Sequence, residues 1–447
     1  MTIDSFRDSF SGRILADGDD GFAAAPYPSG VPSLVVRPES VSDISAALAF
    51  ARQGDLVVSV RSGGHSAGGW SSAGGGVDID MSAFTEIAVD GTRVTIGTGA
   101  TWGVVAATLG QHGLALSSGD NRSVGVGGLT LGGGVGWLVR QYGLAFDSLL
   151  SARIVSADGE LVTASAEQNP DLFWAIRGGG GNFGVVVDFT FEAHALDGIL
   201  HGVITFDDTD LVTILRGYRD VLRASPEELN VTFMLWPPMG PEMPGGPQLH
   251  VVYGSPDEAA GMTAIAPLLA IPGVTGHDIR PKAYVDALEE PHPPEPGAPM
   301  PVIVGNNGWA PELSDDAINA IAATVDAMGQ GGVLMIRYLA GAFNRVDAEA
   351  TAVAWRRAEA LVISFAFLPP GADGDQIARI NDAWIGTAAF TEGTYGNFLG
   401  YAGESVVNLM YPPATRARLS AVKHRWDPQN VFSQTQNILP IAEGAVS

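Results

Sequence analysis

The chain of 447 residues contains no cysteine. This absence excludes disulfides, thiolate metal sites, a cysteine nucleophile and any cofactor bonded through sulfur. Basic residues are also few, since 24 lysines and arginines stand against 49 aspartates and glutamates, which gives a net charge of −25. Because phosphates attract the opposite sign, nucleic acids and anionic membranes are unsuitable partners.

Long apolar runs are missing as well. No apolar stretch reaches the roughly 18 residues that cross a bilayer, so we expect no membrane association. The first 22 residues lack the basic segment and apolar stretch of a signal peptide, and we therefore expect a cytoplasmic protein. The histidines show no metal-binding H-x-x-x-H or H-E-x-x-H spacing, and no G-x-S-x-G motif appears. We expect neither a metal site nor hydrolase chemistry.

Glycine is what the chain has in excess, with 58 residues, about 13% against a typical ~7%. Many lie in three clusters, at residues 62–69, 119–136 and 178–184. The first cluster follows an expected strand at 56–61. Successive small residues there let backbone N–H groups converge on an anion, or let a flat cofactor lie against the chain. A surface turn with an incidental His65 is the alternative interpretation.

The second cluster favours the cofactor interpretation. It interleaves glycine with Val124, Leu129, Leu131 and Val135, whereas a flexible linker would be polar and repetitive. The segment therefore indicates ordered backbone packed against something flat. A tight stack of turns inside a core is the alternative.

Other segments predict an α+β protein. Caps and apolar periodicity predict helices at 42–51, 102–112 and 315–328. A hairpin is expected at 149–163 around Asp158-Gly159. Near residue 195 glycine becomes sparse. The prolines at 291–296 predict an exposed loop near a substrate entrance or a domain edge.

Four motifs, in this order, carry a family resemblance. They are R-S-G-G-H at 61–65, V-G-V-G-G-x-x-x-G-G-G-x-G at 124–136, L-F-W-A-I-R-G-G-G-G-N-F-G at 172–184, and a C-terminal group with Y-G-N-F at 395–398 and W-D-P-Q-N-V-F at 426–432. The chain resembles the FAD oxidases of the vanillyl-alcohol oxidase (p-cresol methylhydroxylase) superfamily. More narrowly, it is similar to the berberine-bridge-enzyme-like group, which includes the hydroxynicotine oxidases.

The resemblance implies an α+β fold with a two-part FAD-binding domain. Residues 1–200 and 401–447 should form that domain. Residues 201–400 should form an α+β substrate domain whose antiparallel sheet covers the flavin.

The resemblance also implies residues that hold FAD. His65 matches the histidine that bonds covalently to the 8α-methyl carbon of the flavin; an unmodified histidine is the alternative. The first loop should line the pyrophosphate and dimethylbenzene side, the second loop the phosphates and ribityl chain, and Val185 and Val186 the adenine. The expected cofactor residues are Val60, Arg61, Ser62, Gly63, Gly64, His65, Ser66, Gly69, Trp70, Gly119, Asp120, Val124, Gly125, Gly127, Gly128, Leu131, Gly133, Gly134, Val135, Gly136, Gly184, Val185, Val186, Tyr395, Asn397 and Asn437.

Two positions refine the expected chemistry. Relatives with two covalent links carry a cysteine where this chain has Asn121, so the flavin should be attached once, without a cysteinyl link. In the family, the residue at Val124 controls oxygen access. Valine there implies an oxidase that returns electrons to O₂ and releases H₂O₂, whereas a leucine implies a dehydrogenase.

The catalytic base is less defined. The family's Y-x-N-Y strand points to Tyr395 and Asn397, with Tyr401 as a further candidate, but the fourth residue here is Phe398. A tyrosine has an ordinary pKa of about 10 and needs a lowered value to act as a base, so flavin packing is the alternative role of Tyr395. Possible substrate-pocket residues, each with a purely structural alternative, are Trp236, Tyr253, Trp309, Arg337, Tyr338 and Asn344.

The resemblance thus implies an FAD-dependent oxidase. It would oxidise a C–H next to an alcohol or amine by hydride transfer to flavin N5, with O₂ as the second substrate. The aromatic pocket candidates favour a small, largely apolar metabolite or amine over a long polysaccharide. The alternatives are an FAD-dependent dehydrogenase with another acceptor, an oxidative cyclase of secondary metabolism, and a non-catalytic flavin carrier. The oligomeric state is left open.

Overall fold

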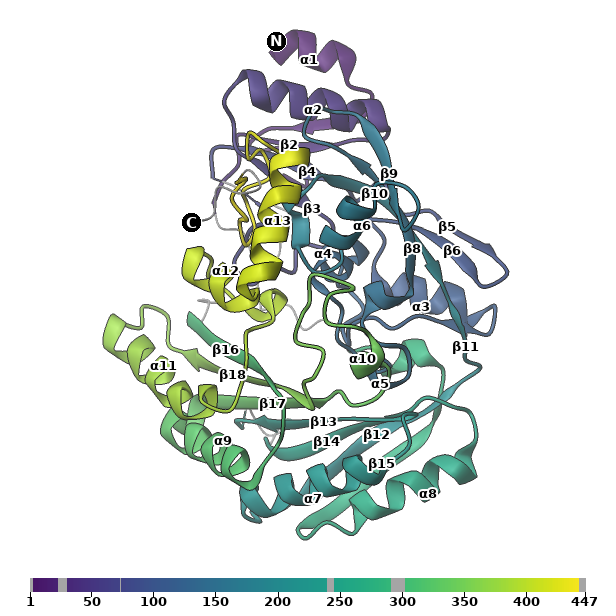
Figure 1. Cartoon of the computed structure of the whole chain (residues 1–447), viewed down its shortest axis with the longest axis vertical. Coiled ribbons are helices and arrows are strands. Elements are labelled where there is room, and N and C mark those ends of the chain that lie inside the picture. Colours follow the sequence, from purple (N-terminus) through teal and green to yellow (C-terminus); the bar gives the residue numbers. More distant parts are fainter. Residues whose placement is uncertain (1–2, 23–29, 73, 239–244, 291–301, 442–447) are drawn as a thin grey trace.

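The computed structural model describes residues 3–22, 30–72, 74–238, 245–290 and 302–441. The proline-rich loop expected at 291–296 lies outside these residues. Figure 1 shows two parts: one holds the N-terminal sheets and the C-terminal helices, and the other holds one large sheet with helices on one face. Within the described ranges, no helix is long and apolar enough to cross a membrane.

A small sheet begins the N-terminal part, in the order β1-β2-β4-β3. Strands β2, β4 and β3 are parallel, and β1 is antiparallel to β2. Helix α2 begins with a capping box between Ser40 and Asp43, which confirms the helix expected at 42–51. Phe6 of α1 stacks on Phe50 of α2, with ring centroids 4.5 Å apart. The elements are α1 (Ile3–Ser9), β1 (Arg13–Leu15), β2 (Leu34–Arg37), α2 (Val41–Gln53), β3 (Val58–Arg61) and β4 (Val77–Asp80).

A second sheet follows, in the order β5-β6-β10-β8-β9, with every pairing antiparallel. Strands β8 and β9 form the hairpin expected around Asp158-Gly159. The strands are β5 (Ile87–Asp90), β6 (Arg93–Gly97), β8 (Leu149–Val155), β9 (Leu161–Ser165) and β10 (Val185–Glu192), beside the short pair β7 (Leu114–Ala115) and β11 (His194–Ala195). The helices are α3 (Trp102–Gly110), α4 (Val126–Gly132), α5 (Val139–Tyr142) and α6 (Pro170–Ala175), with 3₁₀ turns η1 (Ala145–Ser148) and η2 (Gly180–Asn182).

The substrate domain is built on a seven-stranded antiparallel sheet in the order β15-β12-β14-β13-β17-β18-β16. The strands are β12 (Ile199–Phe206), β13 (Leu229–Trp236), β14 (Gly246–Tyr253), β15 (Val274–Lys282), β16 (Val302–Ala310), β17 (Gly332–Tyr338) and β18 (Ala360–Leu368). The other elements are α7 (Leu211–Ala224), α8 (Glu258–Leu269), η3 (Tyr284–Ala287), α9 (Asp315–Met328), η4 (Gly329–Gly331), α10 (Ala342–Arg345) and α11 (Gly374–Ala388).

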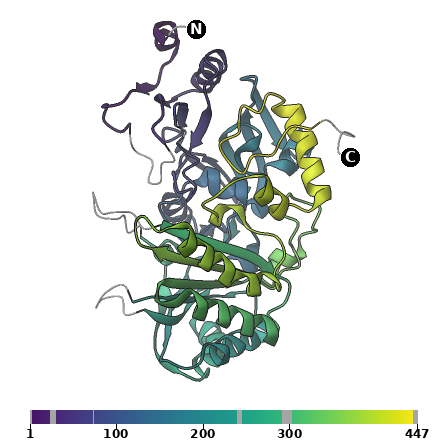
Figure 2. The same cartoon turned by 90° about the vertical axis from the view of Figure 1, so that its left-hand side faces the viewer.

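Alternation along β17 shows how this sheet divides its two faces. Leu334, Ile336 and Tyr338 join the core beneath α7, α8 and α9. Met335 and Arg337 therefore face the opposite side, toward the N-terminal part (Figures 1 and 2). The antiparallel sheet expected in the substrate domain is confirmed.

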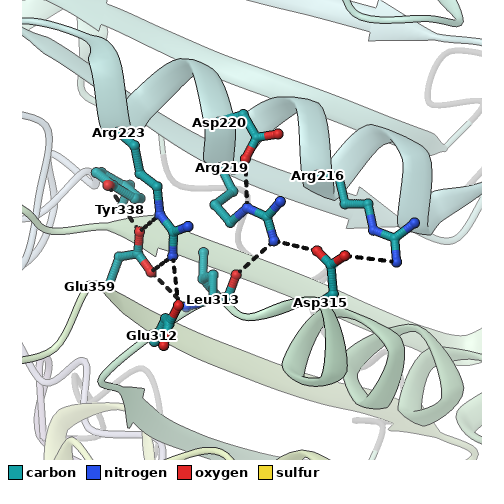
Figure 3. A network of polar contacts seen from close by, with 9 residues as sticks. All are labelled: Arg216, Arg219, Asp220, Arg223, Glu312, Leu313, Asp315, Tyr338 and Glu359. Atoms are coloured by element: carbon teal, nitrogen blue, oxygen red, sulfur yellow. Dashed lines mark hydrogen bonds and ion pairs between the residues drawn. The ribbon is translucent and has the colours of Figure 1, made fainter.

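Ion pairs connect α7 to the start of α9 and to Glu359, the residue just before β18 (Figure 3). Arg223 Nε donates to the Glu359 carboxylate at 2.6 Å, which also accepts from the backbone N–H of Leu313 at 2.6 Å and from the Tyr338 hydroxyl at 3.1 Å. Arg219 reaches Asp315 at the start of α9 at 2.6 Å. The network holds the helical layer together on the helix side of the sheet, the side that Tyr338 faces.

The C-terminal segment returns to the N-terminal part through η5 (Gly396–Phe398), α12 (Glu404–Met410) and α13 (Pro413–Trp426). Helix α13 lies beside α6, where the Arg418 guanidinium sits 3.8 Å from the centre of the Trp174 ring. A second tie comes from Arg356, buried with two bonds of 2.7 and 2.8 Å to the Asp147 carboxylate. Such bidentate pairs fix orientation as well as distance, so the two parts have a defined relation.

Candidate cofactor and substrate site

The first two glycine-rich loops touch, and glycine is required where they meet. A Cβ atom on Gly63 would collide with the backbone nitrogen of Gly125, and one on Gly125 would collide with Ser62 Oγ. The Ser62 hydroxyl donates to the carbonyl of Thr98 at 2.7 Å and accepts from the N–H of Gly127 at 3.2 Å. The loops therefore form one surface, held by backbone contact.

His65 lies on this surface in a short relay of hydrogen bonds. Its Nε2 is 2.9 Å from Ser123 Oγ, and that hydroxyl donates to Asn121 Oδ1 at 2.7 Å. The same Asn121 oxygen accepts the Ser123 backbone N–H at 2.9 Å. Burial lowers the pKa of His65, which favours the neutral imidazole. Asn121, which stands where some relatives carry the cysteine of a second flavin link, thus holds Ser123, the serine that contacts His65.

Unpartnered polar atoms indicate what these loops can hold. Among the described residues, Ser66 Oγ, Thr130 Oγ1 and Asn437 Oδ1 are buried without a hydrogen-bond partner. Gly128 of α4 faces open space, where a Cβ would meet no atom within 4 Å. Buried polar atoms ordinarily have partners, so these atoms suit a polar cofactor. FAD, with its pyrophosphate, hydroxyls and ring edge, fits this set of donors and acceptors.

Two expected cofactor residues use their side chains elsewhere. Arg61 is buried and pairs with Asp80 at 3.2 Å, and Arg37 also reaches Asp80, at 2.7 Å. Asp120 pairs with Arg337 of the substrate domain. Their side chains are engaged in these ion pairs, and their cofactor contacts stay predictions.

The remaining expected cofactor residues are placed as follows. Val185 and Val186 are buried at the start of β10, in two different apolar clusters, after Gly184 at φ +150°. Residues on β3, the two loops or the segment around α4 are Val60, Gly64, Gly69, Trp70, Gly119, Val124, Gly127, Leu131, Gly133, Val135 and Gly136. Their cofactor contacts stay predictions.

The candidate bases do not share one environment. Tyr395 is buried, and its hydroxyl oxygen lies 3.0 Å from both the Gly134 N–H and the Asn397 Nδ2 that donate to it. Burial raises the pKa of Tyr395 to about 12. Tyr401 is 47% exposed, and partial desolvation by the surrounding protein raises its pKa. Their proton role stays a prediction, while the geometry favours Tyr395 as a packing and orienting residue.

The third glycine cluster has a structural role that the sequence did not reveal. Asn182 accepts the Ile438 N–H at 2.9 Å and donates to the carbonyl of Gln436 at 3.1 Å. The fully buried Lys423 ammonium donates to the Asn182 carbonyl at 2.8 Å and to Asp427 at 2.6 Å. The L-F-W-A and W-D-P motifs thus interlock, and the chain on both sides of Asn437 is tied to the third glycine cluster.

The substrate-pocket candidates separate by sheet face. Trp236, Trp309 and Arg337 lie on the face toward the glycine-rich loops, as alternation along their strands requires. Tyr253 and Tyr338 belong to the helix-side core. Asn344 donates to the carbonyls of Arg356 and Ala358. These contacts support the structural alternative for Tyr253, Tyr338 and Asn344.

Comparisons with known proteins agree with this geometry. An FAD binding domain model matches residues 32–165, and a berberine and berberine-like model matches residues 410–439. An uncharacterized FAD-linked oxidoreductase of Bacillus subtilis, YgaK, is 30% identical over 97% of this chain and 98% of its own length. The (R)-6-hydroxynicotine oxidase of Paenarthrobacter nicotinovorans is 28% identical over 97% of both chains.

A solved structure gives the same result for the fold. The 6-hydroxy-D-nicotine oxidase of Arthrobacter nicotinovorans superposes with a TM-score of 0.83 at 26% identity, covering 97% of this chain and 99% of the other. The fold, the glycine-rich loops and the full-length relatives together identify the family. The chain belongs to the berberine-bridge-enzyme-like family of FAD-linked oxidoreductases.

Proposed function

We propose that this FAD-linked oxidoreductase is an oxidase whose FAD is attached once, to His65, through the 8α carbon. It oxidises a C–H beside a hydroxyl or amine of a small organic molecule. The observation that carries the proposal is the relay from His65 through Ser123 to Asn121 where the two loops meet. Bound FAD supplies the acceptor for hydride, at N5, and passes the electrons to O₂, which becomes H₂O₂.

The relay assigns the tautomer of His65. An amide oxygen only accepts, and two donors from Ser123 fix Asn121 Oδ1 in place, so the serine proton points to Asn121. Ser123 Oγ then accepts from His65 Nε2–H, which puts the imidazole lone pair on Nδ1. Burial lowers the pKa of His65 and so keeps that lone pair unprotonated near neutral pH. A neutral, oriented imidazole is the form that can bond to an electrophilic carbon.

Asn121 supports a single attachment. A second link would need a thiol, and the chain has no cysteine. The oxidase assignment draws on Val124, whose short side chain stands where the family controls oxygen access, and on the relative named as an oxidase.

Anaerobic reduction followed by reoxidation tests the proposed function. Holoenzyme is mixed with a panel of alcohols, amines and natural products without oxygen, and bleaching of the flavin band is recorded. Air-saturated buffer is then added in a stopped-flow instrument. We expect rapid reoxidation with one H₂O₂ per flavin. Flavin that stays reduced in air but reoxidises with a quinone would show a dehydrogenase, and no bleaching by any compound would favour a flavin carrier.

A further inference from the structure

A buried arginine faces the loops with part of its guanidinium unused. Arg337 is 3% exposed, and its Nη2 pairs with Asp120. Among the described residues, its Nε and Nη1 have no hydrogen-bond partner. The guanidinium lies 5.8 Å from the centre of the Trp137 ring and 6.0 Å from that of Phe398. Buried N–H groups without acceptors are costly, so this position suits an oxygen atom supplied by a ligand.

The segment at 284–290 fixes the backbone of Glu289 beside Asp120, the partner of this arginine. The Glu289 N–H donates to the Asp120 carbonyl at 2.6 Å, and the Arg122 N–H donates to the Glu289 carbonyl at 3.1 Å. Two side-chain bonds hold the rest of the segment: Trp137 Nε1 to the Ala287 carbonyl at 3.0 Å, and Tyr284 Oη with Ser118 Oγ at 3.1 Å. The backbone of Glu289 is therefore held on the second glycine-rich loop, beside Asp120, and its carboxyl group is close enough to Asp120 and Arg337 to feel their charges.

The charge on Glu289 is sensitive to its surroundings. Glu289 is an exposed residue, yet the protein atoms around its carboxyl group raise its pKa, and the charge of Asp120 adds to this. The charge of Arg337 opposes the rise, and the resulting pKa is about 7. A carboxylate with such a value can accept a proton near neutral pH.

Within the part of the chain that the structure describes, the histidines and tyrosines around the cluster do not titrate in that range. Burial lowers the pKa values of His250 and His201 to about 4, so both are neutral at pH 7. Burial raises the pKa values of Tyr284 and Tyr395, which stay protonated. Charged groups nearby among the described residues include Asp286 of η3, Lys282, which contacts His201 Nδ1 at 3.0 Å, and the ion pair of Arg122 with Glu290.

We propose that Arg337 and Glu289 bind and deprotonate a hydroxyl group of the substrate, with Asp120 positioning both. The inference rests on the proposed function and names its substrate class as alcohols. Arg337 donates to the hydroxyl oxygen while the Glu289 carboxylate accepts the hydroxyl proton. The O–H bond breaks toward Glu289, and FAD, when bound, would accept the hydride from the carbon. The electron pair of the O–H bond completes the C=O bond, and Arg337 stays bonded to the product oxygen.

A hydroxyl group fits this cluster better than an amine or an acid. It offers lone pairs to Arg337 and a proton to Glu289 in one group. An ammonium has no lone pair for the unused guanidinium nitrogens. A carboxylate has no proton to give at neutral pH, and Asp120 and Glu289 would repel it. Tyr395 is less suited to accept the proton because its oxygen already accepts two N–H bonds.

Ligand binding tests the proposal independently of turnover. Benzyl alcohol, benzylamine and benzoate are titrated into oxidised, air-equilibrated holoenzyme, and the change in the flavin absorbance band gives each Kd. We expect benzyl alcohol to bind at least tenfold more tightly than the other two. Arg337→Lys should weaken benzyl alcohol binding at least tenfold, because a lysine that pairs with Asp120 has no further planar donors to offer. Arg280→Met, on the exposed edge of the same sheet, should leave the Kd unchanged.

Preferred binding of the amine or the acid, or no spectral change with any of the three ligands, would overturn the proposal. So would an Arg337→Lys variant that keeps its yellow flavin and binds benzyl alcohol as the wild type does. These results do not depend on oxidase activity. A holoenzyme that binds benzyl alcohol through Arg337 but is reduced by no compound would sink the proposed function and leave the hydroxyl site standing.

The pH dependence of flavin reduction tests Glu289. With any alcohol that bleaches the flavin, the reduction rate should fall about tenfold per pH unit below pH ~7, as Glu289 becomes protonated. Glu289→Gln should lower the rate at least 100-fold at pH 8 and abolish this dependence, while the adjacent Glu290→Gln should retain both. An unchanged pH profile in Glu289→Gln would overturn the assignment.

Discussion

Replacing Lys423 by methionine should destabilise the C-terminal segment strongly. The Lys423 ammonium and the Asp427 carboxylate are fully buried and 2.6 Å apart, and the ammonium also donates to the carbonyls of Asn182 and Phe432 at 2.8 and 2.9 Å. Methionine fills similar volume but leaves Asp427 as a buried charge with no counterion. Breaking such a pair costs about 3–5 kcal/mol, so we expect a loss of about 4 kcal/mol.

A second substitution separates the charge from the hydrogen bonds. Asp427 also accepts the N–H groups of Val431 and Phe432, at 2.8 and 2.9 Å. An asparagine side chain at this position can keep one of these bonds without a charge. The double variant Lys423→Met/Asp427→Asn should therefore lose about 2 kcal/mol less than the sum of the two single variants.

Urea unfolding followed by tryptophan fluorescence measures these values, with the slope checked for constancy. Lys423→Arg is not a matched control, because the larger guanidinium does not fit the buried position. Arg425→Met is the matched control: its side chain is exposed and lies on the same helix, and it should cost less than about 1 kcal/mol. Additive single and double variants would refute the argument that a buried ion pair holds the segment.

Three further predictions follow from single positions. Gly128→Ala should leave the stability of the apoprotein unchanged or raise it by up to about 1 kcal/mol, because the added Cβ meets no protein atom. The same substitution should lower the flavin-to-protein absorbance ratio. A variant with full flavin content would contradict the placement of FAD at Gly128. Glu359→Gln should cost about 2 kcal/mol at pH 7 in urea unfolding. Burial would raise the pKa of Glu359, but hydrogen bonds led by the one from Arg223 lower it below its usual value. The stability that the Glu359 carboxylate contributes is therefore present above pH ~4.5 and lost as the pH falls further. A stability difference between wild type and variant that does not change with pH would contradict this reasoning. Ser123→Ala should slow covalent flavin attachment to apoprotein roughly tenfold, measured as colour left after acid precipitation, because His65 loses its Nε2 partner; attachment at the wild-type rate would refute the relay.

The sequence predicted local structure where short-range chemistry decides it. Ser40 and Asp43 cap the helix near residue 42, and Asp158-Gly159 closes the hairpin between β8 and β9. The helix expected at 315–328 was found with those bounds. The glycine-rich motifs carried the resemblance that indicated FAD and the family. At positions within them such as Gly63, close backbone approach leaves glycine as the only residue that fits.

The rest depended on contacts between residues far apart in the chain. Arg337 meets Asp120 across 217 positions, and only the sheet register brings Arg337 to the face toward the loops. Arg61 belongs to a matching motif, but its partner Asp80 on the parallel neighbouring strand decides where its guanidinium lies. No local pattern indicated that Glu289 would be fixed on the second loop, since its bonds there are made by backbone atoms.

The state of the flavin after denaturation tests the central claim most directly. Wild-type protein and His65→Ala are precipitated with acid, washed and redissolved in denaturant, and their absorbance and intact mass are recorded. We predict that the wild type stays yellow and gains the mass of one FAD, while His65→Ala is colourless with the mass of the bare chain. A colourless wild type, or a variant that keeps its flavin, would contradict attachment through His65.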